Sequence, residues 1–485
     1  MNIKSEINQS INHNNDSVDD LNKNIFKPKY DRALLSSGII HIGVGNFHRA
    51  HQAYYINEYL NNYNDLNWGI VGVNLRKSES DNFQSLINRK GKYILKTIST
   101  KGEKKYNEIH SITELYDWSK DSQKAESIFG NPDLEIVTMT VTETGYYISE
   151  NNELNLNLPI VKNNIAGEEK SIIYSYLYNA LKIRKEECNK PVTLLCCDNI
   201  RENGVMLKNT LLTYVKASND IELLNWIIEN VSFPSCVVDR ITPRAPDNLA
   251  EEINDKFNIK EGCSVMAEPF IQWVIEDKFI GKRPALEKIG VQFIDNVFPY
   301  EEAKIRILNG GHLMLSYLGV MQGLQTYDQV INHKELQKFF FNLEKKEIIP
   351  ALGNDIPFDL DDYLLVIFDR FKNEYIADKL ERLTMDGSGK FPIFVLPTIR
   401  MCFEKGITPQ HCIESIASWY AFMFKIHKGE LKFDYYEPRW KWICLFLHHE
   451  KIDDFINCKE LWGTVPSTYP EFKSILKKEI LKFKL

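Results

Sequence analysis

Several features that would identify a specialised class of protein are missing from the sequence. Its 485 residues include nine cysteines, an odd number without a Cys-x-x-Cys pair, and the adjacent Cys196 and Cys197 cannot form an ordinary disulfide. No cluster of cysteine and histidine has the spacing of a metal site, so we expect no metal. No run approaches the roughly 20 uncharged apolar residues that cross a bilayer, and the first residues lack the apolar core of a secretory signal. We therefore expect a cytoplasmic protein with reduced thiols and no membrane partner.

A strong charge of either sign is also missing. The 59 Lys and Arg residues oppose 66 Asp and Glu residues, which gives a net charge of -7. Because a domain that binds duplex nucleic acid normally carries a basic excess, we expect no nucleic-acid partner. What is present is the balance of an ordinary globular protein, with 44% hydrophobic and 26% charged residues, in a chain long enough for more than one domain.

The hydrophobic pattern divides the chain into three parts. Residues 1–30 begin with a polar, asparagine-rich stretch that predicts a disordered tail. Residues 31–295 alternate short apolar runs with amphipathic stretches such as Lys170–Glu187, the pattern of a parallel sheet covered by helices on both faces. Residues 296–485 carry mostly helical patterns, for example Ala303–Met321. The predicted strands are Ile39–Val44, Trp68–Val73, Leu134–Val141, Val192–Cys197 and Ser235–Val238.

The first predicted strand runs into a turn with two glycines. Gly43 permits a tight turn, and Gly45 removes the side chain that would keep a pyrophosphate away from the backbone. His48 stands where a third glycine is usual, and a purely structural turn is the alternative. With the alternating strands and helices, this turn predicts an α/β fold, in which a Rossmann-type dinucleotide-binding domain precedes a mostly α-helical C-terminal domain. The predicted cofactor-binding residues are Ile42, Gly43, Val44, Gly45, Asn46, Phe47, His48 and Arg49.

The acid that reads the coenzyme ribose is absent from its usual place. In NAD enzymes a carboxylate at the end of the second strand binds the ribose hydroxyls and repels a 2′-phosphate. Here the chain continues as Asn74, Leu75, Arg76 and Lys77, and the first carboxylate is Glu79. Arg76 and Lys77 would attract a 2′-phosphate, unless they belong to a solvated loop. We therefore expect NAD as the cofactor and leave NADP open.

One stretch of the helical part combines a lysine, an amide and an imidazole. An α-helix would place Lys304, Asn309 and His312 at about 0°, 140° and 80°, on one half of its surface. Gly310 and Gly311 lie between them, although each glycine costs a helix about 1 kcal/mol relative to alanine. Glycines make sense where a cofactor or substrate approaches the backbone. The alternative is a solvated helix face.

Ordered blocks along the chain resemble the mannitol dehydrogenase family, the polyol-specific long-chain dehydrogenases. The resemblance extends over roughly residues 38–460, and therefore over both predicted domains. The matching blocks are Gly43–Ala53, Thr140–Tyr146, Cys197–Asn199, Val238–Pro243, Glu268–Trp273, Lys304–His312, Arg382–Leu383 and Asp386–Ser388.

The resemblance implies that a secondary alcohol is oxidised without zinc, with a lysine as the general base. Lys304 would take the hydroxyl proton, and Asn309 and Asn199 would donate hydrogen bonds to the oxygen. Glu301, one helical turn before Lys304, would relay the proton, whereas Glu302 points elsewhere. The residues expected to hold substrate hydroxyls are His312, Asp239, Arg382 and Lys390, and His312 also belongs to the catalytic set.

This chemistry requires a base that is ready to accept a proton. An alcohol with a pKa of about 16 gives up its proton near neutral pH only to a base in surroundings that stabilise the anion. A lysine can serve only when it is neutral. We therefore expect burial and nearby cations such as Arg382 to lower the pKa of Lys304.

The expected reaction is the interconversion of D-mannitol and D-fructose with NAD. Fructuronate or tagaturonate reduction and D-arabinitol or sorbitol oxidation are alternatives, and a nucleotide-binding sensor is the alternative that is not an enzyme. The expected partner is a small polyol or ketose. The expected assembly is a monomer or a small homo-oligomer.

Overall fold

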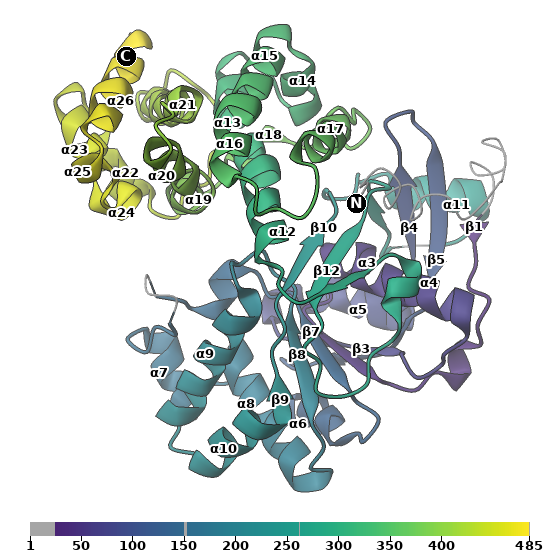
Figure 1. Cartoon of the computed structure of the whole chain (residues 1–485). Coiled ribbons are helices and arrows are strands. Elements are labelled where there is room, and N and C mark those ends of the chain that lie inside the picture. The colour runs from purple at the N-terminus through teal and green to yellow at the C-terminus, as the bar shows by residue number, and fades with distance from the viewer. Residues whose placement is uncertain (1–24, 150–152, 261, 485) are drawn as a thin grey trace. The chain divides into compact units, whose positions relative to one another are not determined.

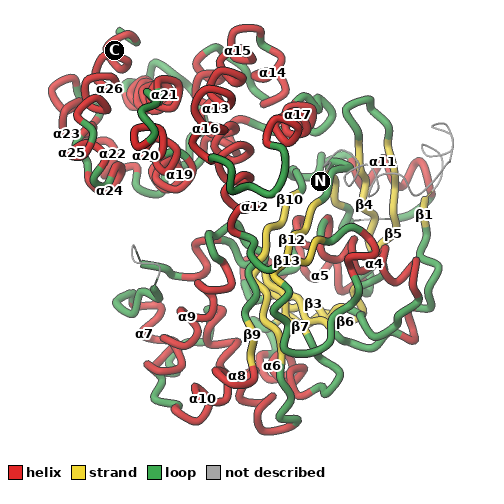
Figure 2. The backbone as a smooth tube through the Cα atoms, in the orientation of Figure 1, coloured by secondary structure: helices red, strands yellow, loops and turns green. Residues whose placement is uncertain are grey.

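The computed structural model describes residues 25–149, 153–260 and 262–484. These residues form two units, one that ends at Phe298 and one that begins at Pro299 (Figure 1). Strands lie in the first unit, and the described part of the second forms helices and loops apart from one isolated bridge (Figure 2). The predicted fold class, a Rossmann-type α/β domain followed by a helical domain, is confirmed.

Six parallel strands form the central sheet of the first unit. The strand order is β6–β3–β2–β7–β8–β9, so the chain proceeds from β2 toward one edge and then from β7 toward the other. This reversal creates a crevice at the carboxyl ends of the strands, where ligands bind in such sheets. The strands are β2 (Ile39–Ile42), β3 (Ile70–Asn74), β6 (Ile112–Asp117), β7 (Ile136–Met139), β8 (Val192–Cys196) and β9 (Val231–Ser232).

Alternate residues of the central strands pack into two different cores, because successive side chains of a strand point to opposite faces. Ile40 and Ile42 of β2 join the core that contains α8 (Ile173–Glu187). Ile39 joins the core that contains α4 (Gln52–Tyr63). Full burial of such an aliphatic side chain contributes about 1.5–3 kcal/mol. Helices therefore cover both faces of the sheet, as its continuous apolar runs predict.

Two smaller sheets complete the first unit, with the orders β1–β5–β4–β11 and β10–β12–β13. Of the five predicted strands, the first four lie in the central sheet, but the last one, at β10, pairs antiparallel with β12. The prediction that it continues the parallel sheet is wrong, because an apolar run does not specify its pairing partner. The strands are β1 (Ile25–Phe26), β4 (Tyr93–Ile98), β5 (Lys104–Ile109), β10 (Cys236–Asp239), β11 (Val265–Ala267), β12 (Gln272–Glu276) and β13 (Gln292–Ile294).

The predicted disordered tail over residues 1–30 extends too far along the chain. Ile25–Phe26 form β1, which pairs in parallel with β5. Tyr30 is buried, and its hydroxyl donates a hydrogen bond to Asn57 Oδ1 at 2.8 Å. The correction applies to residues 25–30, since residues 1–24 lie outside the described residues.

The remaining helices of the first unit lie at the ends of strands or beside the sheet. They include α3 (Asn46–Ala50), α5 (Ser80–Asn88), α9 (Asn203–Ala217), α10 (Ile221–Asn230) and α11 (Leu249–Phe257).

Aromatic side chains form much of the core of the second unit. Trp419 is fully buried, and its ring centroid lies 4.7 Å from that of Phe391 and 6.3 Å from that of Trp462. No helix in the described ranges is long and apolar enough to cross a membrane. The main helices are α12 (Phe298–Ala303), α13 (Gly311–Met321), α14 (Tyr327–Asn332), α15 (Lys334–Leu343), α17 (Leu360–Phe371), α18 (Leu380–Thr384), α19 (Gly387–Phe394), α20 (Leu396–Glu404), α21 (Gln410–His427) and α26 (Pro470–Lys482).

Candidate functional site

The carboxyl ends of four central strands lie level at one edge of the sheet. Ile42 of β2 stands beside Val73 of β3 and Met139 of β7, and Met139 stands beside Cys196 of β8. The segments that follow these strands therefore begin at the same edge. They include the glycine turn and the segment of Asn199, so this edge is where a dinucleotide would be held.

The two glycines of the turn after β2 differ in what they require. Gly43 has a φ of +89°, and an added Cβ would lie 2.1 Å from Thr140 O, so the fold itself demands glycine. At Gly45 an added Cβ would meet nothing nearer than Gly43 O at 3.9 Å. Protein packing does not explain the second glycine, whereas the approach of a pyrophosphate does. The turn therefore fits a dinucleotide.

The histidines after the turn pack inside the unit. His48 is fully buried and stacks on His41 with ring centroids 3.4 Å apart. Burial, and then the neighbouring His41 and Arg49, hold the pKa of His48 well below its usual value, so the ring is neutral. His51 bonds Gln272 O at 2.8 Å and stacks on Phe47. The side chain of His48, a predicted cofactor-binding residue, is therefore not available to a dinucleotide, and only its backbone could contact one.

Asn46 and Arg49 tie the turn to its surroundings. Arg49 Nη2 donates to Asn46 Oδ1 at 2.6 Å, and the same guanidinium donates to Cys263 O. Tyr93 of β4 donates its hydroxyl to Arg49 O at 2.6 Å. These bonds hold α3 against the smaller sheet and fix the direction in which the turn faces.

A half-buried carboxylate whose role was not predicted from the sequence organises the loop after β7. Asp198 accepts hydrogen bonds from Val141 N at 2.9 Å, from Thr142 N at 3.2 Å and from the Tyr146 hydroxyl at 2.7 Å. Burial raises its pKa to about 6, and these donors oppose that rise. Its only signal in the sequence is an acid directly after a buried strand. The predicted catalytic Asn199 follows it and is exposed.

Asp239 ends β10 as a buried side chain, 4% exposed. The neighbouring Arg240 donates from Nε to Glu268 O at 2.9 Å and lies over the Tyr54 ring at 4.9 Å. The guanidinium of Arg240 is thus committed to other elements, and simple pairing with Arg240 does not account for Asp239.

The predicted catalytic stretch is continuous helix, but not α-helix throughout. Lys304–Gly310 form a π-helix between α12 and α13. The assumption of α-helical spacing is therefore wrong for this stretch. In a π-helix the N–H of residue i+5 bonds to the carbonyl of residue i, so Asn309 follows Lys304 by one turn. An α-helix would rotate the two apart by about 140°, so the π turn brings them nearer to one line than predicted.

Most polar residues of this helix are buried rather than solvated, and Asn309 is half-buried. Lys304 is 7% exposed and Glu301 is 4% exposed. Glu302 forms a buried ion pair with Arg306, one helical turn further along the chain. The alternative of a solvated face is thereby excluded.

The glycines of the stretch have a different cause from the expected one. An added Cβ at Gly311 would lie 2.9 Å from Glu344 Oε1 and 3.1 Å from Phe340 Cε2. At Gly310 the nearest atoms lie 3.4 Å away. The expectation that a ligand approaches the backbone is wrong for Gly311, where a neighbouring helix fills the space.

His312 is held by aromatic rings. Its ring lies edge-on to Tyr327 at 4.3 Å and beside Phe371 at 4.0 Å, and Tyr327 donates its hydroxyl to Gly311 O at 2.9 Å. Burial, and then Arg382, Arg370 and Lys390, hold the pKa of His312 well below its usual value. The ring is therefore neutral, and the charges of three nearby cations favour that form.

The two predicted cationic substrate ligands lie on neighbouring helices of the same unit. Arg382 on α18 forms a two-point ion pair with Asp378, with Nε donating to Oδ1 at 2.7 Å. Lys390 on α19 donates from Nζ to Leu383 O at 3.2 Å. Arg382 was expected to lower the pKa of Lys304 through its positive charge. The carboxylate of Asp378 offsets that charge.

Known protein families account for both units. The model of the mannitol dehydrogenase Rossmann domain matches residues 37–288, and that of the mannitol dehydrogenase C-terminal domain matches residues 296–479. The chain belongs to the mannitol dehydrogenase family. The resemblance seen in the sequence is confirmed, and the chain is a dehydrogenase with the domain order that the sequence predicted.

Members of the mannitol dehydrogenase family that are similar to this chain differ in their named substrates. D-arabinitol 4-dehydrogenase of Klebsiella pneumoniae is 36% identical over 82% of this chain and 86% of its own. D-mannonate oxidoreductase of Escherichia coli is 35% identical over 87% of both chains. The structure of Pseudomonas fluorescens mannitol 2-dehydrogenase with NAD and D-mannitol matches with a TM-score of 0.87, 32% identity and coverage of 95% and 94%.

Within this family member, no group of three His, Cys, Asp or Glu side chains that could hold a metal ion occurs among the described residues. The nine cysteines are free, and seven of them are buried. They serve as small packing residues of the two units.

Proposed function

We propose that this chain oxidises a hexitol at a secondary alcohol and reduces the matching 2-ketose, with D-mannitol and D-fructose as the pair and NAD(H) as the coenzyme. The Pseudomonas fluorescens enzyme, whose structure holds NAD and D-mannitol, supports both choices. The observation that carries the proposal is a buried lysine, Lys304, followed one π turn later by Asn309.

The first role of the chain is to remove the hydroxyl proton. Lys304 accepts this proton at Nζ, for which it must be neutral. Asn309 and Asn199 donate N–H groups to the oxygen as it gains negative charge, and each such donor is worth about 100-fold or more in rate. The Gly43–Gly45 turn would hold NAD, which when bound would accept the hydride that leaves the carbinol carbon.

The second role is to orient the substrate and pass the proton on. The neutral ring of His312 has one N–H donor and one acceptor, which suits a hydroxyl group. Arg382, Lys390 and Asp239 hold further hydroxyls. Glu301, buried on the helical turn before Lys304, relays the proton away from the amine.

The test uses the purified full chain with NADH and a panel of D-fructose, D-xylulose, fructuronate and tagaturonate. Among the ketoses we expect the highest kcat/KM with D-fructose. In the reverse direction we expect the chain to oxidise D-mannitol with NAD. Turnover of D-xylulose alone would assign the chain to D-arabinitol. No turnover of any ketose, with NADH still bound, would favour a nucleotide-binding sensor.

Uronate reduction is the second candidate, because three cationic side chains act electrostatically on His312. Arg370, Arg382 and Lys390 together exceed what a neutral hexitol needs, and a carboxylate could pair with one of them. The similarity to D-mannonate oxidoreductase points the same way. A kcat/KM for fructuronate or tagaturonate above that for D-fructose would show that the chain is a uronate reductase and not a mannitol dehydrogenase.

A further inference from the structure

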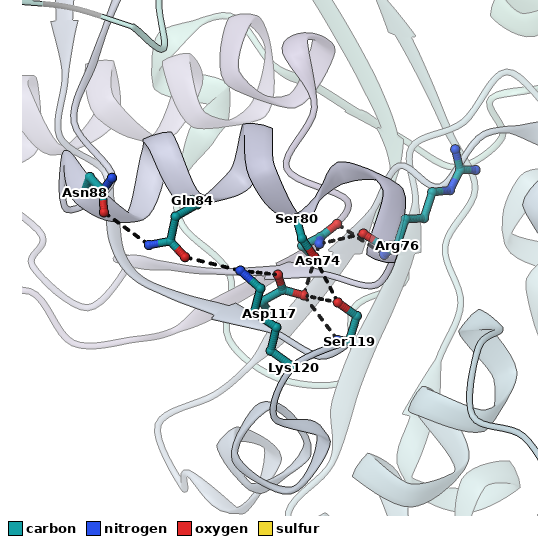
Figure 3. Close-up of polar contacts among 8 residues, drawn as sticks. All are labelled: Asn74, Arg76, Ser80, Gln84, Asn88, Asp117, Ser119 and Lys120. Carbon is teal, nitrogen blue, oxygen red and sulfur yellow. Dashed lines mark hydrogen bonds and ion pairs between the residues drawn. The ribbon is translucent and has the colours of Figure 1, made fainter.

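The edge of the sheet where NAD enzymes place an acid carries a neutral side chain. Asn74 ends β3, and its amide donates to Asp117 Oδ1 at 3.2 Å and to Arg76 O at 2.9 Å (Figure 3). Its carbonyl oxygen accepts from Arg76 N at 3.2 Å. Asn74 is buried and its amide nitrogen and oxygen are both hydrogen-bonded within the protein. It therefore does not replace the carboxylate that accepts hydrogen bonds from the ribose hydroxyls in NAD enzymes.

The nearest carboxylate at this edge is engaged elsewhere. Asp117, at the end of β6, accepts from Ser119 Oγ at 2.7 Å and from Ser119 N at 3.2 Å, and Lys120 Nζ lies 3.8 Å from its other oxygen (Figure 3). Glu79, the first acid after the strand, accepts from Asn82 Nδ2 at 3.1 Å. Asp117 is buried, and its Oδ1 is occupied by these donors and by Asn74.

Arg76 spans the edge in the other direction. Its Nη2 donates to Val141 O at 2.6 Å and to Thr142 Oγ1 at 2.9 Å, both in the loop after β7. Since β2 lies between β3 and β7, the side chain crosses the carboxyl end of β2, where the Gly43–Gly45 turn lies. Figure 3 shows it extending away from the Asn74–Asp117 cluster. Both bonds use Nη2, and no hydrogen bond to Nε or Nη1 occurs among the described residues, which leaves these groups for a ligand.

We propose that the chain binds NADP(H) as well as NAD(H), and that Arg76 is the residue that pairs with the 2′-phosphate. The proposal rests on the dinucleotide site of the proposed function. A guanidinium recognises phosphate through several N–H groups at once, and Arg76 is fixed by its bonds to the β7 loop before the ligand arrives. The adjacent Lys77 is exposed and adds positive charge. The neutral Asn74 neither repels the phosphate nor prevents NAD from binding.

The experiment measures binding to the full chain without turnover, by quenching of intrinsic fluorescence and by calorimetry. NADPH and NADH are compared, and so are 2′,5′-ADP and 5′-ADP, which isolate the phosphate from the nicotinamide. Because hydrogen bonds to charged groups contribute more than neutral ones, we expect the Kd of NADPH to lie within about tenfold of that of NADH, and the Kd values of 2′,5′-ADP and 5′-ADP to show a similar ratio.

Two variants assign the effect to Arg76. Arg76→Ala should weaken NADPH and 2′,5′-ADP about tenfold or more, while NADH changes less than about threefold. Arg76→Lys should retain part of the preference. Lys182→Ala is the matched control, because this exposed lysine of α8 pairs with Asp220 and lies outside this cluster, and both dinucleotides should bind as before.

The outcomes separate this inference from the proposed function. NADH binding with NADPH about 100-fold weaker or worse would overturn the inference and leave the proposed function intact. Equal weakening of both dinucleotides in Arg76→Ala would show a structural role for Arg76 and also overturn it. Failure of all four nucleotides to bind would refute the proposed function itself.

Discussion

At the scale of single residues, burial sets Lys304 apart. Lys96 and Lys304 are the two buried lysines in the described ranges of the chain. Lys96 pairs with Glu252 of α11 at 2.7 Å, so its burial has a structural reason. Lys304 lies on a helix that also carries Asn309 and the neutral His312, a grouping that suits proton transfer from an alcohol.

Replacement of this lysine tests its role directly. Lys304→Ala should lower kcat about 100-fold to 10,000-fold, because a positioned general base contributes that much, and should leave the Kd for NADH nearly unchanged. Steady-state kinetics and NADH fluorescence measure the two effects. Lys345→Ala, at an exposed lysine of the same unit that pairs with Asp361, is the control. Turnover near that of the unsubstituted enzyme would remove Lys304 from its assigned role.

Single residues were predictable where the sequence itself places the relevant groups together. Gly43 and Gly45 share one turn, and Lys304 and Asn309 share one helix. Asp198 could not be assigned a role, because its partners Val141 and Thr142 come from a loop that precedes it by more than 50 residues. The ring of His48 turns inward to stack on His41 of β2, a tertiary contact that residue types and spacing do not indicate.

At the scale of elements, apolar runs and periodicity predict where strands and helices lie but not their finer form. The run at β10 gives no sign of its antiparallel partner β12. The pattern of Ala303–Met321 predicts one helix, yet the change of hydrogen bonding from i+4 to i+5 within it leaves no trace in hydrophobicity.

The two glycines after the π turn provide a matched test of packing at the element scale. Gly311→Ala should lower the free energy of unfolding by about 1–3 kcal/mol, because its methyl group would press on Glu344 and Phe340. Gly310→Ala should be neutral or raise it by up to about 1 kcal/mol, since its methyl group would meet atoms at 3.4 Å and alanine favours helix. Urea unfolding measures both. Equal effects of the two substitutions would contradict the packing explanation.

At the scale of the whole molecule, neutral buried histidines link folding to pH. Burial lowers the pKa of His41 to about 3 and holds those of His48 and His312 well below their usual values. A group whose pKa is lower in the folded state than in the unfolded state stabilises the fold fully above its unfolded pKa. That contribution is lost as the pH falls through 6.5 toward the folded pKa.

The expected result is a loss of stability on mild acidification. Between pH 7 and pH 5, each such histidine should remove up to about 2 kcal/mol from the free energy of unfolding. His41→Gln should therefore lose less stability than the unsubstituted chain over that interval, as measured by chemical unfolding at both pH values. The exposed His449→Gln should follow the unsubstituted chain. Parallel behaviour of all three proteins would refute the link.

The two-unit plan was predictable, because the strand pattern ends where the second unit begins. The substrate was less predictable from the sequence, because similar members of the family are named for arabinitol, mannonate and mannitol. In the proposed function, substrate choice depends on side chains around His312, and a pairing such as that between Arg382 and Asp378 becomes visible only in three dimensions.

The alternating packing of β2 restricts how this chain can diverge. Its four residues reach two separate cores, with Ile40 and Ile42 on one side and Ile39 on the other. Inserting or deleting a single codon there would exchange the two sides and turn Gly43 out of alignment with its neighbours. Length variation among close homologues should therefore spare the segment from Ile39 to Gly43, even where the surrounding loops grow or shrink.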